Sequence, residues 1–102
     1  MDITLYIYLI DNQISELEAD HMRALAASLE TLVLAGNSLS SVPEAVLWNL
    51  GRLVRLDLSR NNIINIHSMA FQTGLPALAY LHLADNLLGR THMLGIIERL
   101  LL

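Results

Sequence analysis

The chain has 102 residues, which corresponds to at most one domain with a modest hydrophobic core. Apolar residues make up 54% of it and charged residues only 16%, so the composition is very apolar for a small soluble domain. The net charge is −4, and the six basic residues, all arginines, are scattered along the chain. This balance lacks the basic footprint of a nucleic-acid-binding protein, and we expect no nucleic-acid partner.

The chain contains no cysteine, which rules out a disulfide framework, a thiolate metal site and a cysteine nucleophile. The apolar start, Met1 to Ile10, has Asp2 where a signal peptide carries cations, and no cleavage site of small residues follows it. No apolar run is long enough to span a bilayer. We therefore expect neither a signal peptide nor a membrane helix.

One pattern, apolar-x-apolar-x-x-Asn, recurs four times, and its asparagines follow one another at steps of 25, 24 and 25 residues. Further columns keep the same spacing and are apolar throughout, except at Thr4 and Thr91. Such periods are the signature of a solenoid, in which each repeat is one coil that buries its apolar side against its neighbours. The pattern predicts a single domain over residues 1–102, with repeats at about 4–28, 29–52, 53–77 and 78–102.

The stretch from Leu29 to Asn86 follows L-x-x-L-x-L-x-x-N-x-L most closely, and Phe71 stands in a later column. This pattern resembles the typical class of leucine-rich repeats, and the resemblance covers residues 4–102. It is similar to repeats in the ectodomains of Toll-like, Slit-like and chaoptin-like animal surface proteins. The resemblance implies an α/β solenoid: a curved right-handed coil with a short parallel β-sheet on its concave face and loops or short helical turns on its convex face.

The first two repeats each predict a strand followed by a helical turn. The strand is indicated by alternating apolar residues, whose side chains turn inward on one face of a sheet. After the asparagine, Ser15-x-x-Glu18 and Ser41-x-x-Glu44 have the form of capping boxes, and Pro43 fits a helix start. We therefore expect short helical turns on the outer side of these two coils.

The last two repeats predict strands through Leu56 and Leu58 and through Leu81 and Leu83. From Thr91 to Leu102, apolar residues at helical spacing predict a longer amphipathic helix at the end of the chain. We expect this helix to seal the solenoid, because terminal repeats need a cover. A docking surface for a partner is its alternative role.

The asparagine column is predicted to be structural. At the sharp turn after each strand, a buried side-chain amide can satisfy backbone groups on its own and neighbouring coils. Stacked coils would place these amides in a ladder, formed by Asn12, Asn37, Asn61 and Asn86.

The columns between the inward-facing leucines are predicted to pave the concave face. Their side chains do not serve the core, so they are free to encode recognition of a partner. Tyrosine and arginine, both frequent at interface hot spots, occur among them. The residues that we expect to bind a partner are Tyr6, Tyr8, Thr31, Val33, Arg55, Asp57, Arg60, Tyr80, His82 and Asp85.

No constellation of residues indicates catalysis. The four histidines lack metal-ligand spacing with a supporting carboxylate, so no metal site is expected. His82 lies in a concave column, where a pH-sensitive contact with Asp57 or Asp85 is a further hypothesis. Neither a nucleophile elbow nor a glycine-rich phosphate loop is present. We therefore expect no enzyme, no cofactor and no small-molecule substrate.

These features are typical of a protein–protein recognition module that binds a protein ligand through its concave sheet. The resemblance implies a receptor or cell-adhesion protein with a role in signalling, located outside the cell or at its surface. An intracellular adaptor or scaffold in the cytoplasm is the alternative, favoured by the absence of cysteine, glycosylation sequon and signal peptide. The repeats fill the chain without recognisable caps, so a segment of a larger array and self-association through uncapped ends are further hypotheses.

Overall fold

A computed structural model of the chain describes residues 3–48, 50–66, 71 and 75–89. Short strands and short helices alternate in the first half of the chain, and two strands follow in the second half. In chain order the elements are β1 (Leu5–Tyr8), α1 (Ala19–Arg23), β2 (Leu29–Val33), α2 (Glu44–Leu47), β3 (Arg55–Asp57) and β4 (Tyr80–His82).

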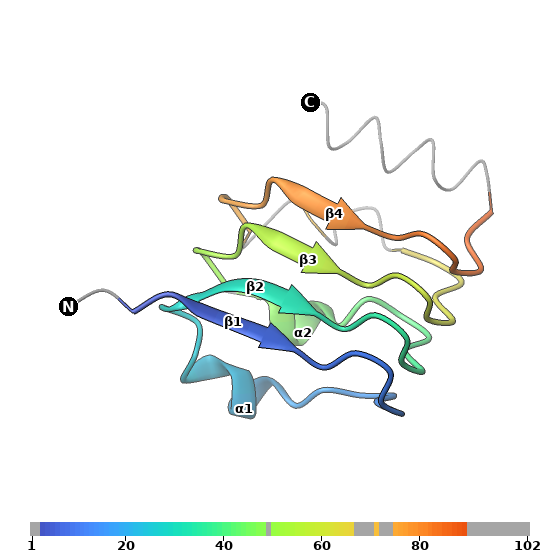
Figure 1. The fold of residues 1–102 in the computed structure, drawn as a ribbon, viewed down its shortest axis with the longest axis horizontal. Helices are drawn as coiled ribbons and strands as arrows, with labels where there is room; N and C mark the ends of the chain where they lie inside the picture. Colours follow the sequence, from blue (N-terminus) through green and yellow to red (C-terminus); the bar gives the residue numbers. More distant parts are fainter. Residues whose placement is uncertain (1–2, 49, 67–70, 72–74, 90–102) are drawn as a thin grey trace.

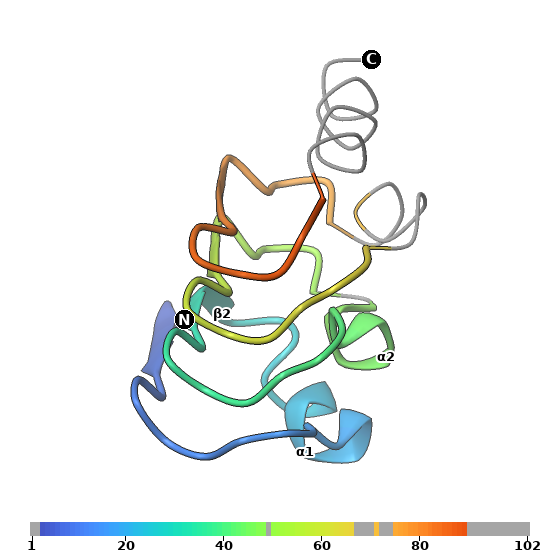
Figure 2. The same ribbon diagram turned by 90° about the vertical axis from the view of Figure 1, so that its right-hand side faces the viewer.

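The four strands form one parallel sheet in the order β1-β2-β3-β4 (Figure 1). Ile7 pairs with Leu32, Leu32 with Leu56, and Leu56 with Leu81, so the backbone register is that of the sequence columns. The alignment of the repeats is thereby confirmed. Parallel neighbours need a crossover connection, and here each repeat supplies one, so that successive turns stack as coils (Figure 2).

The core lies between the sheet and the returning part of each coil. In the two inner coils its leucine and isoleucine columns are fully buried, at Leu29, Leu32, Leu34, Leu39, Leu53, Leu56, Leu58 and Ile63. Burial of one such side chain stabilises the fold by about 1.5–3 kcal/mol. In the outer coils the same columns are only partly buried, at Leu5, Ile7, Leu9, Ile14, Leu78, Leu81, Leu83 and Leu88. An outer coil is covered by a described neighbour on one side only.

Helices α1 and α2 pack side by side on the opposite side of the core from the sheet (Figure 2). Met22 of α1 and Leu47 of α2 are buried, as their column predicts. The short helical turns expected in the first two repeats are therefore confirmed.

The predicted capping boxes are wrong. α1 begins after Glu18 and α2 after Pro43, and neither helix has a side-chain hydrogen bond at its cap. Ser41 instead forms a parallel backbone bridge with Asn65 of the next coil, so it lies in extended backbone before the helix. Glu18 is likewise extended, with φ −92° and ψ 127°, so the helix cannot begin at Ser15. In the second coil, pairing with the next coil thus overrides the local capping signal.

The predicted terminal helix from Thr91 to Leu102 lies outside the described residues. Two of the four histidines considered as metal ligands, His67 and His92, lie outside them as well. Within the described part of the chain, no helix is both long and apolar enough to cross a membrane.

A candidate binding face on the parallel sheet

Two rows of side chains cross the sheet on the face opposite the leucine core, which we call the sheet face. The strand register places Tyr6, Thr31, Arg55 and Tyr80 in the first row. It places Tyr8, Val33, Asp57 and His82 in the second row. Eight of the ten predicted binding residues therefore share this face, and neighbours within a row lie about one strand spacing, roughly 4.8 Å, apart.

Tyrosines dominate the exposed surface at the two edges of the sheet face. Tyr6 and Tyr8 on β1 are 59% and 57% exposed, and Tyr80 on β4 is 60% exposed. Arg55 and His82 are exposed as well, and Asp57 is half-buried. Exposed tyrosines provide large rigid contact areas with a polar end, which suits protein recognition.

Thr31 and Val33 correct the expectation that all residues in these columns are free of packing. Their side chains are buried, and the two residues are only 7% and 3% exposed, respectively. Both stand on β2, which has paired strands on either side, and the larger tyrosines of β1 are their neighbours in register. The small side chains of β2 therefore form the floor of the sheet face and offer a partner little surface.

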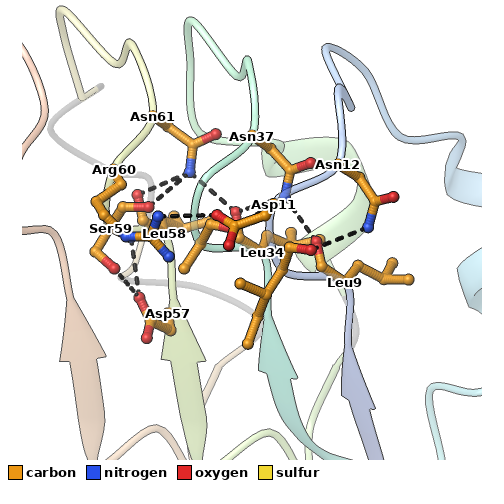
Figure 3. Close-up of polar contacts among 12 residues, drawn as sticks. Leu9, Asp11, Asn12, Leu34, Asn37, Asp57, Leu58, Ser59, Arg60 and Asn61 are labelled. Atoms are coloured by element: carbon orange, nitrogen blue, oxygen red, sulfur yellow. Dashed lines mark hydrogen bonds and ion pairs between the residues drawn. The ribbon is translucent and has the colours of Figure 1, made fainter.

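Asp57 is held by the turn that follows β3. Its Oδ1 accepts a hydrogen bond from the Ser59 backbone N–H at 2.9 Å and from the Ser59 hydroxyl at 2.6 Å (Figure 3). These two bonds fix the carboxylate locally. Asp57 is thus oriented by its own coil before any partner arrives.

The third position after the strand has left-handed backbone in every coil. The φ angle is 56° at Asp11, 71° at Gly36, 53° at Arg60 and 57° at Asp85. Three of these residues have side chains, which rarely adopt this conformation, so the strand-to-turn geometry imposes it in each repeat. Asp85 is exposed at this turn in the fourth coil.

Arg60, predicted as a binding residue, is engaged within the chain. Its Nη1 donates to Oδ1 of Asp11 at 2.8 Å (Figure 3). This bond links the third coil to the first and passes close to Gly36 of the second. A Cβ built at Gly36 would collide with the Asp11 carboxylate and would lie 2.9 Å from Arg60 Nη1. The glycine therefore makes room for this ion pair. Asp11 was absent from the predicted site, although opposite charges flanking a glycine in one column were the available signal.

Asn37 and Asn61 are buried, and their side-chain amides bond to backbone groups of two coils. Oδ1 of Asn61 accepts from the backbone N–H of Leu39 at 3.0 Å, and its Nδ2 donates to Leu34 and Leu58 carbonyls at 3.0 Å each. Leu39 and Leu34 belong to the preceding coil, whereas Leu58 is in the same coil as Asn61. Each amide thus joins two coils, and Figure 3 shows these side chains in line above the strands.

The fourth coil repeats this arrangement. Asn86 accepts from the Ile63 N–H at 3.0 Å and donates to the carbonyls of Leu58 at 2.9 Å and Leu83 at 3.1 Å. Equivalent bonds run from Asn37 to Ile14, Leu9 and Leu34. The amides of Asn37, Asn61 and Asn86 thus each bond to backbone groups of the preceding coil.

Asn12 is not a buried member of the ladder. It is exposed, and its Nδ2 donates only a long bond of 3.3 Å to the Ile10 carbonyl of its own coil. Every other member has one donor and one acceptor partner in the preceding coil, besides a carbonyl of its own coil, and no coil precedes Asn12 among the described residues. The missing neighbour is therefore the physical reason for the difference.

Among the described residues, no three histidine or carboxylate side chains are grouped to hold a metal ion. His82 is exposed in the second row, in register with Asp57. No ion pair between His82 and either Asp57 or Asp85 is present in that part of the chain. The exposed polar and aromatic side chains fit the surface of a binding protein.

The stacked parallel strands and the asparagine ladder define a leucine-rich-repeat coil, and the chain belongs to the leucine-rich-repeat family: the sequence model of that family matches residues 27–88. Among curated proteins, keratocan from Gallus gallus is 42% identical over 84 residues, which cover 80% of this chain and 22% of keratocan. Keratocan from Mus musculus is 36% identical over 88 residues, covering 82% of this chain and 23% of that protein.

A second relative is leucine-rich repeats and immunoglobulin-like domains protein 3 from Mus musculus. It is 37% identical over 73 residues, which cover 72% of this chain and 6% of that protein. The chain thus spans less than a quarter of the length of the relatives it matches. The expected resemblance to animal leucine-rich-repeat proteins is confirmed.

Proposed function

We propose that the chain is a protein-recognition module and not an enzyme, and that it binds a protein partner through the sheet face. The observation that carries this proposal is the set of three tyrosines, each more than half exposed, at the two edges of one sheet. Aromatic side chains in such positions are costly to leave in water and are frequent anchors of protein interfaces. The proposal takes the sheet face as the concave side of a right-handed coil.

We further propose that the module is part of a receptor or cell-adhesion protein, located outside the cell or at its surface. Support comes from the animal leucine-rich-repeat proteins that the chain matches. Surface labelling of intact cells that express the full-length protein tests this location. Labelling of the protein supports it, and protection of the protein until the cells are opened favours the cytoplasmic alternative.

Binding is tested by probing an array of animal extracellular domains with the purified chain carrying a biotin tag. The Tyr6→Ser/Tyr80→Ser variant should weaken binding to any domain recovered by about tenfold or more, because hot-spot tyrosines contribute at least about 1.4 kcal/mol. Trp48→Ser is the matched control, since Trp48 is 58% exposed at the end of α2, on the other side of the core. Loss of binding in the Trp48 variant alone would contradict the proposal.

Self-association through the first coil is a second proposal. Ile3 and Ile10 are exposed there, and the leucine columns of β1 are only partly buried. β1 also lies at one end of the described sheet, and an edge strand is a template for pairing with another chain. A second copy that covers this coil would bury the apolar columns.

A further inference from the structure

Four of the arginines lie in the described part of the chain, and they differ in what their guanidinium groups contact. Three are engaged: Arg23 with Asp20 at 3.1 Å, Arg52 with the Ala27 carbonyl at 3.2 Å, and Arg60 with Asp11 at 2.8 Å. Arg55 is exposed on β3, and its guanidinium has neither a hydrogen bond nor an ion pair among the described residues. Of these four arginines, the one without a partner is thus Arg55, which lies on the sheet face.

The neighbours of Arg55 in its row leave it accessible. Tyr80 stands beside it on β4, and the buried Thr31 stands beside it on β2, with Tyr6 beyond. From the strand spacing, Arg55 is about 5 Å from Tyr80 and about 10 Å from Tyr6 along the row. A cation therefore lies between two exposed phenols, next to the smallest side chain of the row.

Two carboxylates of the sheet-face and turn columns already accept hydrogen bonds within the chain, and Glu30 on β2 forms no ion pair among the described residues. Asp57 accepts two hydrogen bonds from Ser59, and Asp11 accepts from Arg60. Neither carboxylate forms an ion pair with Arg55 among the described residues, so the guanidinium charge is available to a carboxylate of a partner. Because the chain carries a net charge of −4 and Asp57 lies on the same face, a single negative charge is better tolerated there than a dianionic phosphate.

We propose, on the basis of the protein-binding face described above, that Arg55 receives a carboxylate side chain of the partner. The guanidinium fork binds both oxygens of an aspartate or glutamate. Tyr80 and Tyr6 contact apolar groups on either side of that acidic residue. The partner of this face is therefore an acidic protein segment with apolar flanks.

The probe is the peptide acetyl-Leu-Gly-Glu-Gly-Leu-amide, titrated into the isotope-labelled chain and followed by NMR. We expect the Arg55 side-chain Nε–H signal and the Tyr6 and Tyr80 ring signals to shift. The matching peptide with glutamine in place of glutamate should bind about tenfold more weakly, as expected for loss of a charge-assisted hydrogen bond. A phosphoserine peptide that binds more tightly than the glutamate peptide would overturn the choice of a carboxylate.

Substitutions of single arginines test whether Arg55 is the residue that binds the glutamate of the peptide. Arg55→Gln should abolish the preference for glutamate over glutamine, and Arg55→Lys should retain part of it because the charge remains without the fork. Arg52→Gln, on another part of the coil, should leave the preference unchanged. Both positions are exposed, so the fold should be kept although Arg52→Gln loses the exposed bond to the Ala27 carbonyl, and the amide spectrum checks this.

The outcomes separate this inference from the proposed function. If both peptides shift the sheet-face tyrosines equally, or if Arg55→Gln keeps the preference, the carboxylate assignment is wrong while the binding face stands. If the peptides shift signals only on the α1 and α2 side, the proposed face fails together with the inference. Absence of any signal shift at millimolar peptide also overturns the carboxylate assignment. The array of extracellular domains then tests whether the sheet face binds a protein.

Discussion

Asn61 shows how one side chain can hold two coils together. Its amide satisfies a backbone N–H and carbonyl groups that the turn after β3 and the preceding coil would otherwise leave without partners. Buried backbone groups are costly when they lose their hydrogen bonds. The asparagines that join two coils therefore stabilise the stack itself.

Replacement of Asn61 by alanine should lower the free energy of unfolding by about 2–3 kcal/mol, since buried backbone groups of two coils lose their partners. Asn12→Ala is the matched control and should change it by less than about 0.5 kcal/mol, because Asn12 is exposed. Urea unfolding followed by circular dichroism measures both. Equal losses at the two positions would show that the bonds between coils do not carry the effect.

Gly36 combines a left-handed backbone with the close approach of the Asp11–Arg60 ion pair. Gly36→Ala should therefore lower the unfolding free energy by about 1–2 kcal/mol from the backbone conformation alone. Displacement of Asp11 should weaken the exposed ion pair, which adds at most about 1 kcal/mol. Thermal unfolding of the variant measures the loss.

Gly51→Ala serves as the control for Gly36→Ala, because a Cβ at Gly51 would meet nothing within 4 Å. It should be neutral or slightly stabilising. Combining Gly36→Ala with Asp11→Ala removes the collision and leaves the backbone cost. If the double variant is as stable as Asp11→Ala alone, the left-handed backbone is not the cause of the destabilisation.

At the scale of elements, the strands were predictable and the helix starts were not. Alternating leucines and the asparagine column determine both the strand positions and their register, because a shift by one residue would turn the leucines out of the core. Helix starts depend on where pairing between coils ends. Ser41 pairs with Asn65, a contact between coils that its own capping pattern cannot reveal.

The same limit explains the mixed outcome for the sheet face. The columns correctly placed eight residues on one face, but burial within a row depends on the sizes of neighbours in adjacent strands. Val33 is a small side chain on an inner strand beside the larger Tyr8 and is buried, whereas Tyr8 in the same row is exposed at the edge. Likewise, only the folded coils bring Arg60 and Asp11, distant in sequence, into contact.

Strand β2 and strand β4 should consequently respond differently to alanine. Val33→Ala should lower the unfolding free energy by about 1–2 kcal/mol, through lost burial, and leave partner binding unchanged. Tyr80→Ala should change stability by less than about 0.5 kcal/mol and weaken binding to a domain recovered on the array by about tenfold. Denaturation and biolayer interferometry on both variants test this division. Weaker binding by Val33→Ala at full stability would instead make β2 part of the contact surface.

For the whole molecule, the uneven burial of the coils has a consequence in solution. The inner coils bury their leucine columns completely, whereas the first coil leaves the apolar side chains of β1 only partly buried and exposes 45% of Ile10, which follows β1. Covering such apolar surface favours association, and in a concentrated sample a second copy of the chain is available to cover it. We therefore expect reversible self-association that increases with protein concentration.

Light scattering across a concentration series measures this association directly. The average mass should rise above the monomer mass of 11.3 kDa as concentration increases. Ile10→Lys should restore the monomer by placing a charge in the contact. The control Ile64→Lys, at a residue 54% exposed in the third coil, should associate like the unmodified chain. A mass of one chain at every concentration would contradict self-association, and equal effects of the two lysines would move the contact away from the first coil.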